Sequence, residues 1–595
     1  MCGIAAIFAY NIEAPPPDRA QLHAMHDSMA ARGPDGEGLW VSDEARIAMA
    51  HRRLSIIDLT DSGAQPMASS DGSLRIVFNG EIYNYQTLRA ELIAEGARFV
   101  SESDTEVLLH LYAKRGPDMV RSLRGMFAFA IWDERRRGLF MARDPYGIKP
   151  LYYADDGKTF RIASQVKALL AGGGIDTRPE PAGHTGFFLF GNVPEPFTLF
   201  RGIKSLPAGG SLWVDTSGCG EPRRWFDLTA ELANAEATPL DMDALRAALL
   251  DSVRHHMIAD VPVGAFLSSG LDSATLVSLA TEIEGSNLRT VTLGFDAFRG
   301  RADDETPLAE TIAAHYGTTH ETRWIDQANF EAESEPLFAA MDQPTIDGVN
   351  TYFVSKVARE AGLKVALSGL GGDELFGGYT TFREVPLLVR ALGIFRFLPG
   401  IGRAFRWVSA STIRRMASPK YAGLFEYGAR YGDAYLLRRG FFMPWELPEV
   451  LDPDMVRDGL ERLAPRRHLS ETAAPLRTPH LKVSALESAW YMRNQLLRDS
   501  DWASMAHSLE IRTPLVDVEL LRAVAPMLAG NRPASKLDMA STPAKSLPDE
   551  VLGRPKTGFS VPVREWLSGG RVSVDNQSYR DWARFVYDRY TGAVA

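Results

Sequence analysis

The sequence predicts two domains of different fold classes, an α+β domain followed by an α/β domain built on a doubly wound parallel sheet. The chain has 595 residues, which is too many for one hydrophobic core. Short apolar segments separated by turn residues dominate its first third, whereas strand-like and helix-like segments alternate from about residue 240. We therefore expect a first domain at residues 1–215, a linker at 216–239 and a second domain at 240–595.

Apolar runs and helix signals define the elements of the first domain. Strands are expected at 74–78 and 126–132, and helices at 85–95 and 105–114. The first strand leads into Asn79 and Gly80, a dipeptide typical of tight turns, so we expect a turn there. Ser103 and Asp104 are suitable caps for the second helix.

The second domain shows the alternation expected of a parallel sheet. Strands are expected at 263–267, 290–295 and 364–367, and helices at 244–257 and from about residue 273. Sheets of this kind bind their ligands at the carboxyl ends of the strands. We therefore expect binding residues directly after these strands.

Composition and charge argue against several classes of protein. A net charge of −10 and a pI near 5.7 argue against a general nucleic-acid binder. Cys2 and Cys219 are the only cysteines, too few for a disulfide framework or a cysteine-rich zinc site. We find neither a secretory leader pattern nor an apolar run of the about 18–20 residues that span a membrane. These features predict a cytoplasmic protein without a membrane span.

Cys2, directly after the initiator methionine, is the strongest candidate nucleophile. Removal of Met1 would make Cys2 the first residue and leave a free α-amine beside its thiol. An N-terminal amine can act as the base that activates such a nucleophile.

Three further segments of the first domain could assist a nucleophile. Arg53, at the expected start of a strand, could bind a carboxylate through its forked guanidinium. Asn79 and Gly80 could stabilise an oxyanion, and Asp104 could bind an ammonium group. Taken singly, each segment is better explained as a turn or a helix cap than as part of a site.

Six short motifs occur together in this part of the chain. They are MCGI at 1–4, RGPD at 32–35, RLSI at 53–56, NGEIYN at 79–84, SDTE at 103–106 and RD at 143–144. Their order and spacing resemble class II glutamine amidotransferase domains over roughly the first 200 residues. The resemblance implies an N-terminal-nucleophile fold, a four-layer sandwich of two sheets between helices, in which Cys2 attacks the side-chain amide of glutamine. It also implies an oxyanion hole at Asn79 and Gly80, and a glutamine site of Arg53, Leu54, Ser55, Ile56, Ile57, Asn79, Gly80, Glu81 and Asp104.

A serine- and glycine-rich turn, LSSGLDS at 267–273, lies between a predicted strand and a predicted helix. Small residues there let backbone N–H groups approach a phosphate, and a helix N-terminus favours negative charge. The turn lacks the Gly-Lys-Ser/Thr ending of a Walker A loop. It resembles the pyrophosphate loop of ATP pyrophosphatases, which cleave ATP to AMP and pyrophosphate, with Ser269 where glycine is commonest.

A second glycine-rich turn, SGLGGDELFGGY at 368–379, follows the strand predicted at 364–367. Asp272 in the first turn and Asp373 in the second are suitable ligands for Mg²⁺, which binds one or two carboxylates together with phosphates. Lys556, in RPKTGF at 554–559, could neutralise charge on the transition state and on pyrophosphate.

The two glycine-rich turns and the RPKTGF motif follow the Cys2 domain in this order along the chain. Together with that domain they resemble glutamine-hydrolysing asparagine synthetases across nearly the whole chain. The resemblance implies a second domain of the ATP-pyrophosphatase type, with an adenine-nucleotide α-hydrolase-like fold, and ATP and Mg²⁺ as cofactors. Glutamine and aspartate would be the substrates, ammonia would pass through an internal tunnel to β-aspartyl-AMP, and a homodimer is common among such proteins. The nucleotide site would comprise Leu267, Ser268, Ser269, Gly270, Asp272, Ser273, Leu293, Ser368 and Gly369, and the acceptor site Leu370, Gly371, Asp373 and Glu374, with Lys556 catalytic.

Leu370 is the main departure from that family's pattern, which has an acidic residue at this position. A leucine side chain can neither accept a proton nor bind an ammonium group. Two interpretations stay open. Either aspartate is the acceptor and another group takes the acidic role, or the machinery acts on another carboxylate, such as a sugar acid, a cell-envelope precursor or a natural-product intermediate.

Residues 381–420 contain eight Arg or Lys side chains and one acid, Glu384, among many apolar residues. One interpretation is a basic amphipathic surface for an anionic acceptor or a membrane face. The interpretation we favour is a helical excursion that packs on the second domain, with arginine stems covering apolar surface.

Overall fold

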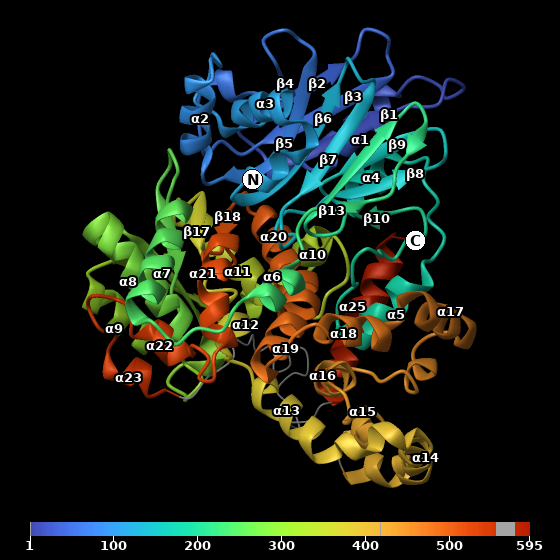
Figure 1. The fold of residues 1–595 in the computed structure, drawn as a ribbon, viewed down its shortest axis with the longest axis vertical. Helices are drawn as coiled ribbons and strands as arrows, with labels where there is room; N and C mark the ends of the chain where they lie inside the picture. Colours follow the sequence, from blue (N-terminus) through green and yellow to red (C-terminus); the bar gives the residue numbers. More distant parts are fainter. Residues whose placement is uncertain (1, 417, 555–576, 595) are drawn as a thin grey trace.

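The computed structural model describes residues 2–416, 418–554 and 577–594 and contains the two predicted domains (Figure 1). The first domain lies at the top of Figure 1 and the second below it, with the carboxyl-terminal helix α25 (Gln577–Val594) packed on the second. Lys556 and most of its motif lie outside the described residues.

Two antiparallel sheets form the centre of the first domain. The first sheet has the order β10-β8-β9-β1-β3-β2, and the second has the order β12-β11-β7-β6-β5-β4, with β13 paired to β11. The strands of the first sheet are β1 (Gly3–Phe8), β2 (Gly36–Val41), β3 (Ile47–Arg53), β8 (Tyr152–Asp155), β9 (Phe160–Ala163) and β10 (Lys204–Ser205). Those of the second are β4 (Met67–Ala68), β5 (Leu74–Ile82), β6 (Gly125–Asp133), β7 (Gly138–Arg143), β11 (Gly210–Asp215), β12 (Gly218–Cys219) and β13 (Arg223–Arg224).

Side chains along each strand point alternately to the two faces of its sheet, and burial of both faces produces four layers. In β1, Ile4 and Phe8 face the second sheet and pack with Val77 and Ala128, whereas Ala5 and Ile7 face the outer helices. Helices α1 (Arg19–Ser28) and α4 (Val166–Gly172) cover the first sheet, and α3 (Asp104–Arg115), beside α2 (Tyr85–Ala94), covers the second. The four-layer sandwich predicted for the first domain is confirmed.

The predicted turn at Asn79-Gly80 is wrong, because β5 continues through both residues to Ile82. Asn79 pairs with Ala128 and Gly80 with Phe127 of β6. Gly80 has a φ of +154°, and a Cβ there would collide with the carbonyl oxygen of Met126. Glycine therefore serves a close approach between strands, and burial of the strand outweighs the local turn preference.

The second domain has a fully parallel sheet of order β16-β15-β14-β17-β18. Its strands are β14 (Val263–Phe266), β15 (Arg289–Phe295), β16 (Thr319–Ile325), β17 (Val365–Leu367) and β18 (Glu510–Arg512). Helices α7 (Met242–His256), α8 (Leu271–Glu284), α9 (Thr306–Tyr316) and α21 (Val518–Ala529) share one core with β14, and α11 (Val349–Glu360) and α20 (Arg498–Met505) share another with β15. The doubly wound sheet is confirmed, and its strand order reverses at β14, where such sheets bind ligands.

The chain between residues 181 and 234 contributes to both domains. Helix α5 (Pro181–Phe190) packs against α17 (Pro453–Leu463) and α25, so Phe187 and Phe188 belong to the core of the second domain. The segment expected as a linker contributes β12 and β13 to the first domain's second sheet and continues into α6 (Leu228–Asn234).

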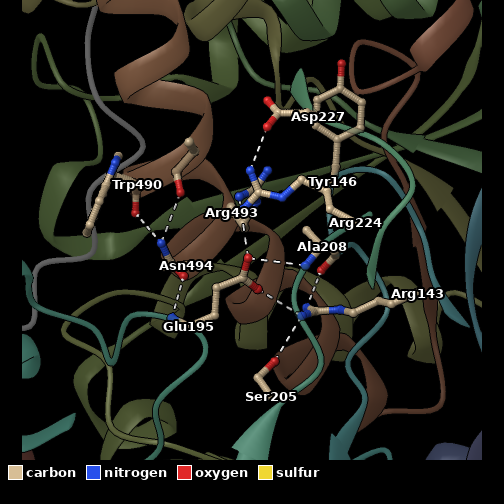
Figure 2. Close-up of polar contacts among 12 residues, drawn as sticks. Arg143, Tyr146, Glu195, Ser205, Ala208, Arg224, Asp227, Trp490, Arg493 and Asn494 are labelled. Carbon is tan, nitrogen blue, oxygen red and sulfur yellow. Dashed lines mark hydrogen bonds and ion pairs between the residues drawn. The ribbon is translucent and has the colours of Figure 1, made fainter. Parts of the chain in front are cut away.

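Buried ion pairs cross the interface between the domains. Arg32 forks onto Asp501 of α20, at 2.7 and 3.0 Å, and both side chains are almost completely buried. Figure 2 shows a second cluster around Glu195, whose carboxylate accepts a hydrogen bond from Arg143 at 2.9 Å and lies 3.4 Å from Arg493. The backbone N–H of Glu195 also donates to Asn494 Oδ1 at 3.0 Å (Figure 2).

We predict that Asp501→Ala lowers the midpoint of urea unfolding strongly, because it leaves the Arg32 guanidinium buried without its carboxylate. Loss of one partner from a buried pair costs about 3–5 kcal/mol. The control is Arg135→Ala, which removes an exposed pair with Asp71 and costs about 0–1 kcal/mol. Equal shifts of the two midpoints would contradict the prediction.

Candidate active sites

A pocket in the first domain gathers residues from the start of β1, the end of β3, the middle of β5 and the start of α3. Its lining includes most of the predicted glutamine-site residues: Cys2, Arg53, Leu54, Ile56, Ile57, Gly80, Glu81 and Asp104. Gln65 and Thr105 complete one wall and hydrogen-bond to each other at 3.2 Å. Ser55 is not among the lining residues, and its N–H donates to Asp35 Oδ2 at 2.9 Å.

Cys2 is buried and its main chain is fixed from two sides. Its nitrogen donates to Asn79 Oδ1 at 2.9 Å, and its carbonyl oxygen accepts from Arg32 Nε at 3.0 Å. The Nδ2 group of Asn79 is buried and has no hydrogen-bond partner among the residues that the structure describes. Burial raises the pKa of the Cys2 thiol, so the thiol needs a base to ionise. Asn79 is buried behind Cys2 and is not itself among the residues that line the pocket.

Arg53 ends β3, so its predicted place at the start of a strand is wrong. Its guanidinium donates to the carbonyl oxygens of Thr60, at 2.7 Å, and of Asp58. These carbonyls belong to the loop after β3, which therefore holds the positive charge at the wall of the pocket.

Two buried carboxyl groups lie in the same pocket. Asp104 accepts a hydrogen bond from the N–H of Ile82 at 3.0 Å, but burial raises the pKa of Asp104 to about 6. Burial also raises the pKa of Glu81, whose Oε2 lies 3.4 Å from Arg512 Nη2 in the second domain. A cation that enters the pocket would favour the ionised form of both groups.

A second group of predicted residues lies at the reversal point of the parallel sheet. The turn after β14 runs into α8, and Ser273 Oγ donates to the carbonyls of Ser268 and Gly270 at 3.1 Å. Leu267 and Leu293 are buried at the ends of adjacent strands. Strand β17 pairs with β14 on its other side, and the N–H of Ser368, the residue after β17, donates to the carbonyl oxygen of Arg512 at 2.8 Å. The strand–turn–helix context predicted for 267–273 is present.

Asp272 and Asp373 converge although they come from different turns. Lys536 Nζ lies 2.6 Å from Asp272 Oδ2 and also contacts Asp373 Oδ1. A Cβ at Gly372 would meet the Asp272 carboxylate and a Cβ at Gly378 would meet the Asp373 carboxylate, so a larger residue at either position would displace one of these side chains. Two carboxylates in a glycine cradle fit a Mg²⁺ ion that takes its remaining ligands from phosphates and water.

Sequence reasoning missed Lys536, which begins the short helix α22 (Lys536–Ala540) and belongs to no recognised motif. Although burial opposes its charge, Asp272 and Asp373 raise the pKa of the Lys536 ammonium. Arg554 is also close, because its guanidinium donates to Ser269 Oγ. Two cations thus lie beside the turns, and only the folded chain brings them there.

The predicted acceptor residues follow β17 as one turn. Leu370 is half-buried, and Gly371 adopts a φ of +99° against Leu515 and Val516. Glu374 is buried and accepts a hydrogen bond from Tyr379 Oη at 2.9 Å. Burial and the nearby Asp373 raise the pKa of Glu374 to about 8. A carboxyl that is largely protonated near neutral pH is therefore present four residues beyond Leu370.

Comparisons with known proteins agree with this division. Residues 1–226 match the glutamine amidotransferase domain family, and residues 244–581 match the asparagine synthase family. The chain is 33% identical to asparagine synthetase [glutamine-hydrolyzing] 1 of Bacillus subtilis, over 95% of this chain and 88% of that protein. It is 34% identical to a putative asparagine synthetase [glutamine-hydrolyzing] of Mycobacterium bovis over 96% and 89% of the two chains, and 34% identical to asparagine synthetase B of Escherichia coli over 65% and 66%. The chain thus belongs to the glutamine-hydrolysing asparagine synthetases, a family of ATP-using ligases with an N-terminal glutamine amidotransferase domain.

Proposed function

We propose that this enzyme makes asparagine from aspartate, with glutamine as the nitrogen donor and ATP as the source of energy. Relatives named asparagine synthetases support aspartate as the acceptor, and the observation that carries the coupling of the two reactions is the position of Arg512 between the two sites. Its guanidinium approaches Glu81 of the Cys2 pocket, and its carbonyl oxygen holds the N–H of Ser368 beside the nucleotide turns. A pocket that releases ammonia and a site that consumes it are therefore adjacent, which suits transfer through an internal passage.

The first half-reaction would take place at Cys2. Once Met1 is removed, the Cys2 nitrogen is an amine held by Asn79 Oδ1, and it takes the proton from the thiol. The thiolate attacks the glutamine amide carbon, while Asn79 Nδ2 and the Gly80 N–H stabilise the oxyanion. The amine returns the proton as ammonia leaves, and water hydrolyses the thioester to glutamate.

Charge in the pocket would orient the glutamine. Arg53 provides the cation for the α-carboxylate, and Asp104 and Glu81 provide carboxylates for the α-ammonium. Leu54, Ile56 and Ile57 form an apolar wall of the same pocket.

The second half-reaction would take place between the turns after β14 and β17. An oxygen of the aspartate side-chain carboxylate attacks the α-phosphorus of ATP, and the bond to pyrophosphate breaks to give aspartyl-AMP. The N–H of Ser269 and the N-terminus of α8 suit the pyrophosphate, whereas the N–H groups of Ser268 and Gly270 donate to Ser273 Oγ and Ser268 Oγ at 3.2 Å. Ammonia then displaces AMP from the acyl carbon, and asparagine forms.

Magnesium would occupy the cradle of Asp272 and Asp373, where it would supply positive charge against the phosphates. Lys536 and Arg554 supply further positive charge from the protein beside the same turns. Glu374, hydrogen-bonded by Tyr379, offers a titratable carboxyl in the turn where Leu370 has none.

The proposal is tested by pyrophosphate release from purified enzyme with Mg-ATP and glutamine, with and without L-aspartate. We expect release that depends on aspartate and matches the asparagine formed. In Cys2→Ala, ammonium chloride should support synthesis while glutamine does not. Glutaminase activity without aspartate-dependent pyrophosphate would contradict asparagine synthesis and would direct the search to other carboxylate acceptors.

The pH dependence of glutamine use should follow Asp104. Because this carboxyl has a pKa of about 6 and only its anion attracts the substrate ammonium, kcat/KM for glutamine should fall as the pH decreases through about 6. When one carboxyl must be ionised, kcat/KM falls about tenfold for each pH unit below the pKa of that carboxyl. In Asp104→Asn, kcat/KM should be low and the fall below about pH 6 should become shallower by one proton, because the pKa of Glu81 is also raised by burial and Glu81 still titrates. A wild-type profile that is flat between about pH 5 and 7 would contradict the role.

Lys536→Ala should lower the rate of pyrophosphate release by about 10²-fold or more, because a fixed cation beside the phosphates is lost. Glutaminase activity should stay within about twofold, since Lys536 lies outside the Cys2 pocket. Arg532→Ala is the matched control, because it removes an exposed cation paired with Asp538 in the same segment. Equal effects of the two changes would argue against a role for Lys536 at the nucleotide.

A further inference from the structure

A helical hairpin projects from the second domain at the end of the molecule opposite the first domain (Figure 1). It comprises α13 (Thr381–Leu392), η6 (Gly393–Phe397) and α14 (Pro399–Met416), and we call it the projecting hairpin. Helix α13 packs against α16 (Tyr431–Arg439), whereas α14 packs against the short α15 (Leu424–Tyr427). Neither active site includes any of its residues.

The projecting hairpin exposes large apolar side chains. Trp407 is 86% exposed, Val408 72%, Phe397 66% and Ile394 63%, and Leu387, Leu398 and Ile401 are also exposed. Single exposed apolar residues are ordinary, but a group of this size on one projection indicates an interaction surface. The favoured interpretation, a helical excursion that packs on the second domain, holds for α13, where Val385, Leu388 and Val389 pack on the core of that domain. It does not hold for these exposed side chains.

The outer face of α14 is not the face that packs on the protein. A Cβ at Gly402 would lie 2.8 Å from the backbone of Glu426, so this side of the helix lies against α15. Arg406 extends from the same side and pairs with Glu426 at 2.8 Å. Ile401 and Val408 are seven residues apart, about two helical turns, so they lie on one side of α14, and both are exposed to solvent.

Positive charge surrounds the apolar face. Residues 381–420 carry eight Arg or Lys and a single acid, although the whole chain has a net charge of −10. The acid, Glu384, is already paired with Arg438 at 2.6 Å. Among the residues that the structure describes, Arg383, Arg390 and Arg396 form no ion pair, and all three are exposed. The hairpin is thus complementary to an anionic surface.

We propose that the projecting hairpin attaches the enzyme to an anionic lipid bilayer, with its apolar face in the headgroup region and its arginines on lipid phosphates. An exposed aromatic and aliphatic face flanked by arginines is the composition of interfacial helices. The side chains protrude from a projecting tip, which a bilayer accepts without a matching pocket. A protein partner would instead need a recess for each of them.

The hairpin would lie on the bilayer and not cross it. Among the described parts of the chain, no single helix is long and apolar enough to cross a membrane. The segments Gly372–Phe397 and Gly400–Ile413 reach that length and composition only as a pair, and they are bent by 112°. Phe397 and Leu398, in the connection between the two helices, are exposed.

Flotation with lipid vesicles tests the proposal on the full-length enzyme. We expect it to float with vesicles of phosphatidylcholine containing about one third phosphatidylglycerol at low salt, and not with phosphatidylcholine alone. Trp407→Ser with Val408→Ser, or Arg390→Glu with Arg396→Glu, should reduce the bound fraction about tenfold or more. The matched control, Val100→Ser with Arg98→Glu, changes an exposed apolar side chain and an exposed arginine of the first domain and should not alter binding.

Insertion of the hairpin is measured separately by quenching of tryptophan fluorescence with brominated lipid. Wild-type enzyme should be quenched, and Trp407→Phe should bind equally but lose most of the quenching. Glutaminase activity should be unchanged in all variants, which shows that they fold. Absence of flotation, flotation that survives the hairpin changes, or a dimer that the Trp407 and Val408 changes dissociate would overturn the proposal.

Discussion

The buried guanidinium of Arg512 is the interaction on which the arrangement of the two domains depends. It lies at the end of β18, completely buried, 2.6 Å from Glu510 Oε1 and within 2.6–2.8 Å of the carbonyl oxygens of His256 and Ile258. A buried charge is tolerated only when its partners are placed well. One of those partners, Glu81, comes from the first domain. The relative position of the two domains is therefore coupled to the geometry of both sites.

The same network determines which acids are ionised. Although burial opposes it, the cations around Glu510 lower the pKa of Glu510 to about 2, whereas burial raises the pKa values of Glu81 and Asp104. One carboxylate thus carries the negative charge that balances the buried cations. The two in the pocket hold their protons more readily until a cation arrives. The pocket and the interface are parts of one electrostatic system.

Local chemistry in the sequence was enough to predict the elements that carry the sites. The LSSGLDS turn lies between strand and helix as expected, and Ser103 caps α3 through the N–H of Thr105. Features that depend on distant partners were not predictable. Gly80 lies within a strand, where a side chain would collide with the carbonyl oxygen of Met126 on the neighbouring strand. Lys536 contacts Asp373, which is 163 residues away in the sequence. The exposure of Trp407 depends on where the hairpin leaves the domain, which hydrophobic periodicity does not encode.

The position of α5 has a consequence for synthesis of the chain on the ribosome. Phe187 and Phe188 are fully buried, but they stack on Phe442 and Tyr587, which are translated much later. At about 5–20 residues per second, these rings wait roughly 20–80 s for the last of their partners. The nascent first domain therefore carries an exposed aromatic helix that it cannot bury. Chaperone engagement during translation is the expected cost of joining the two domains through this helix.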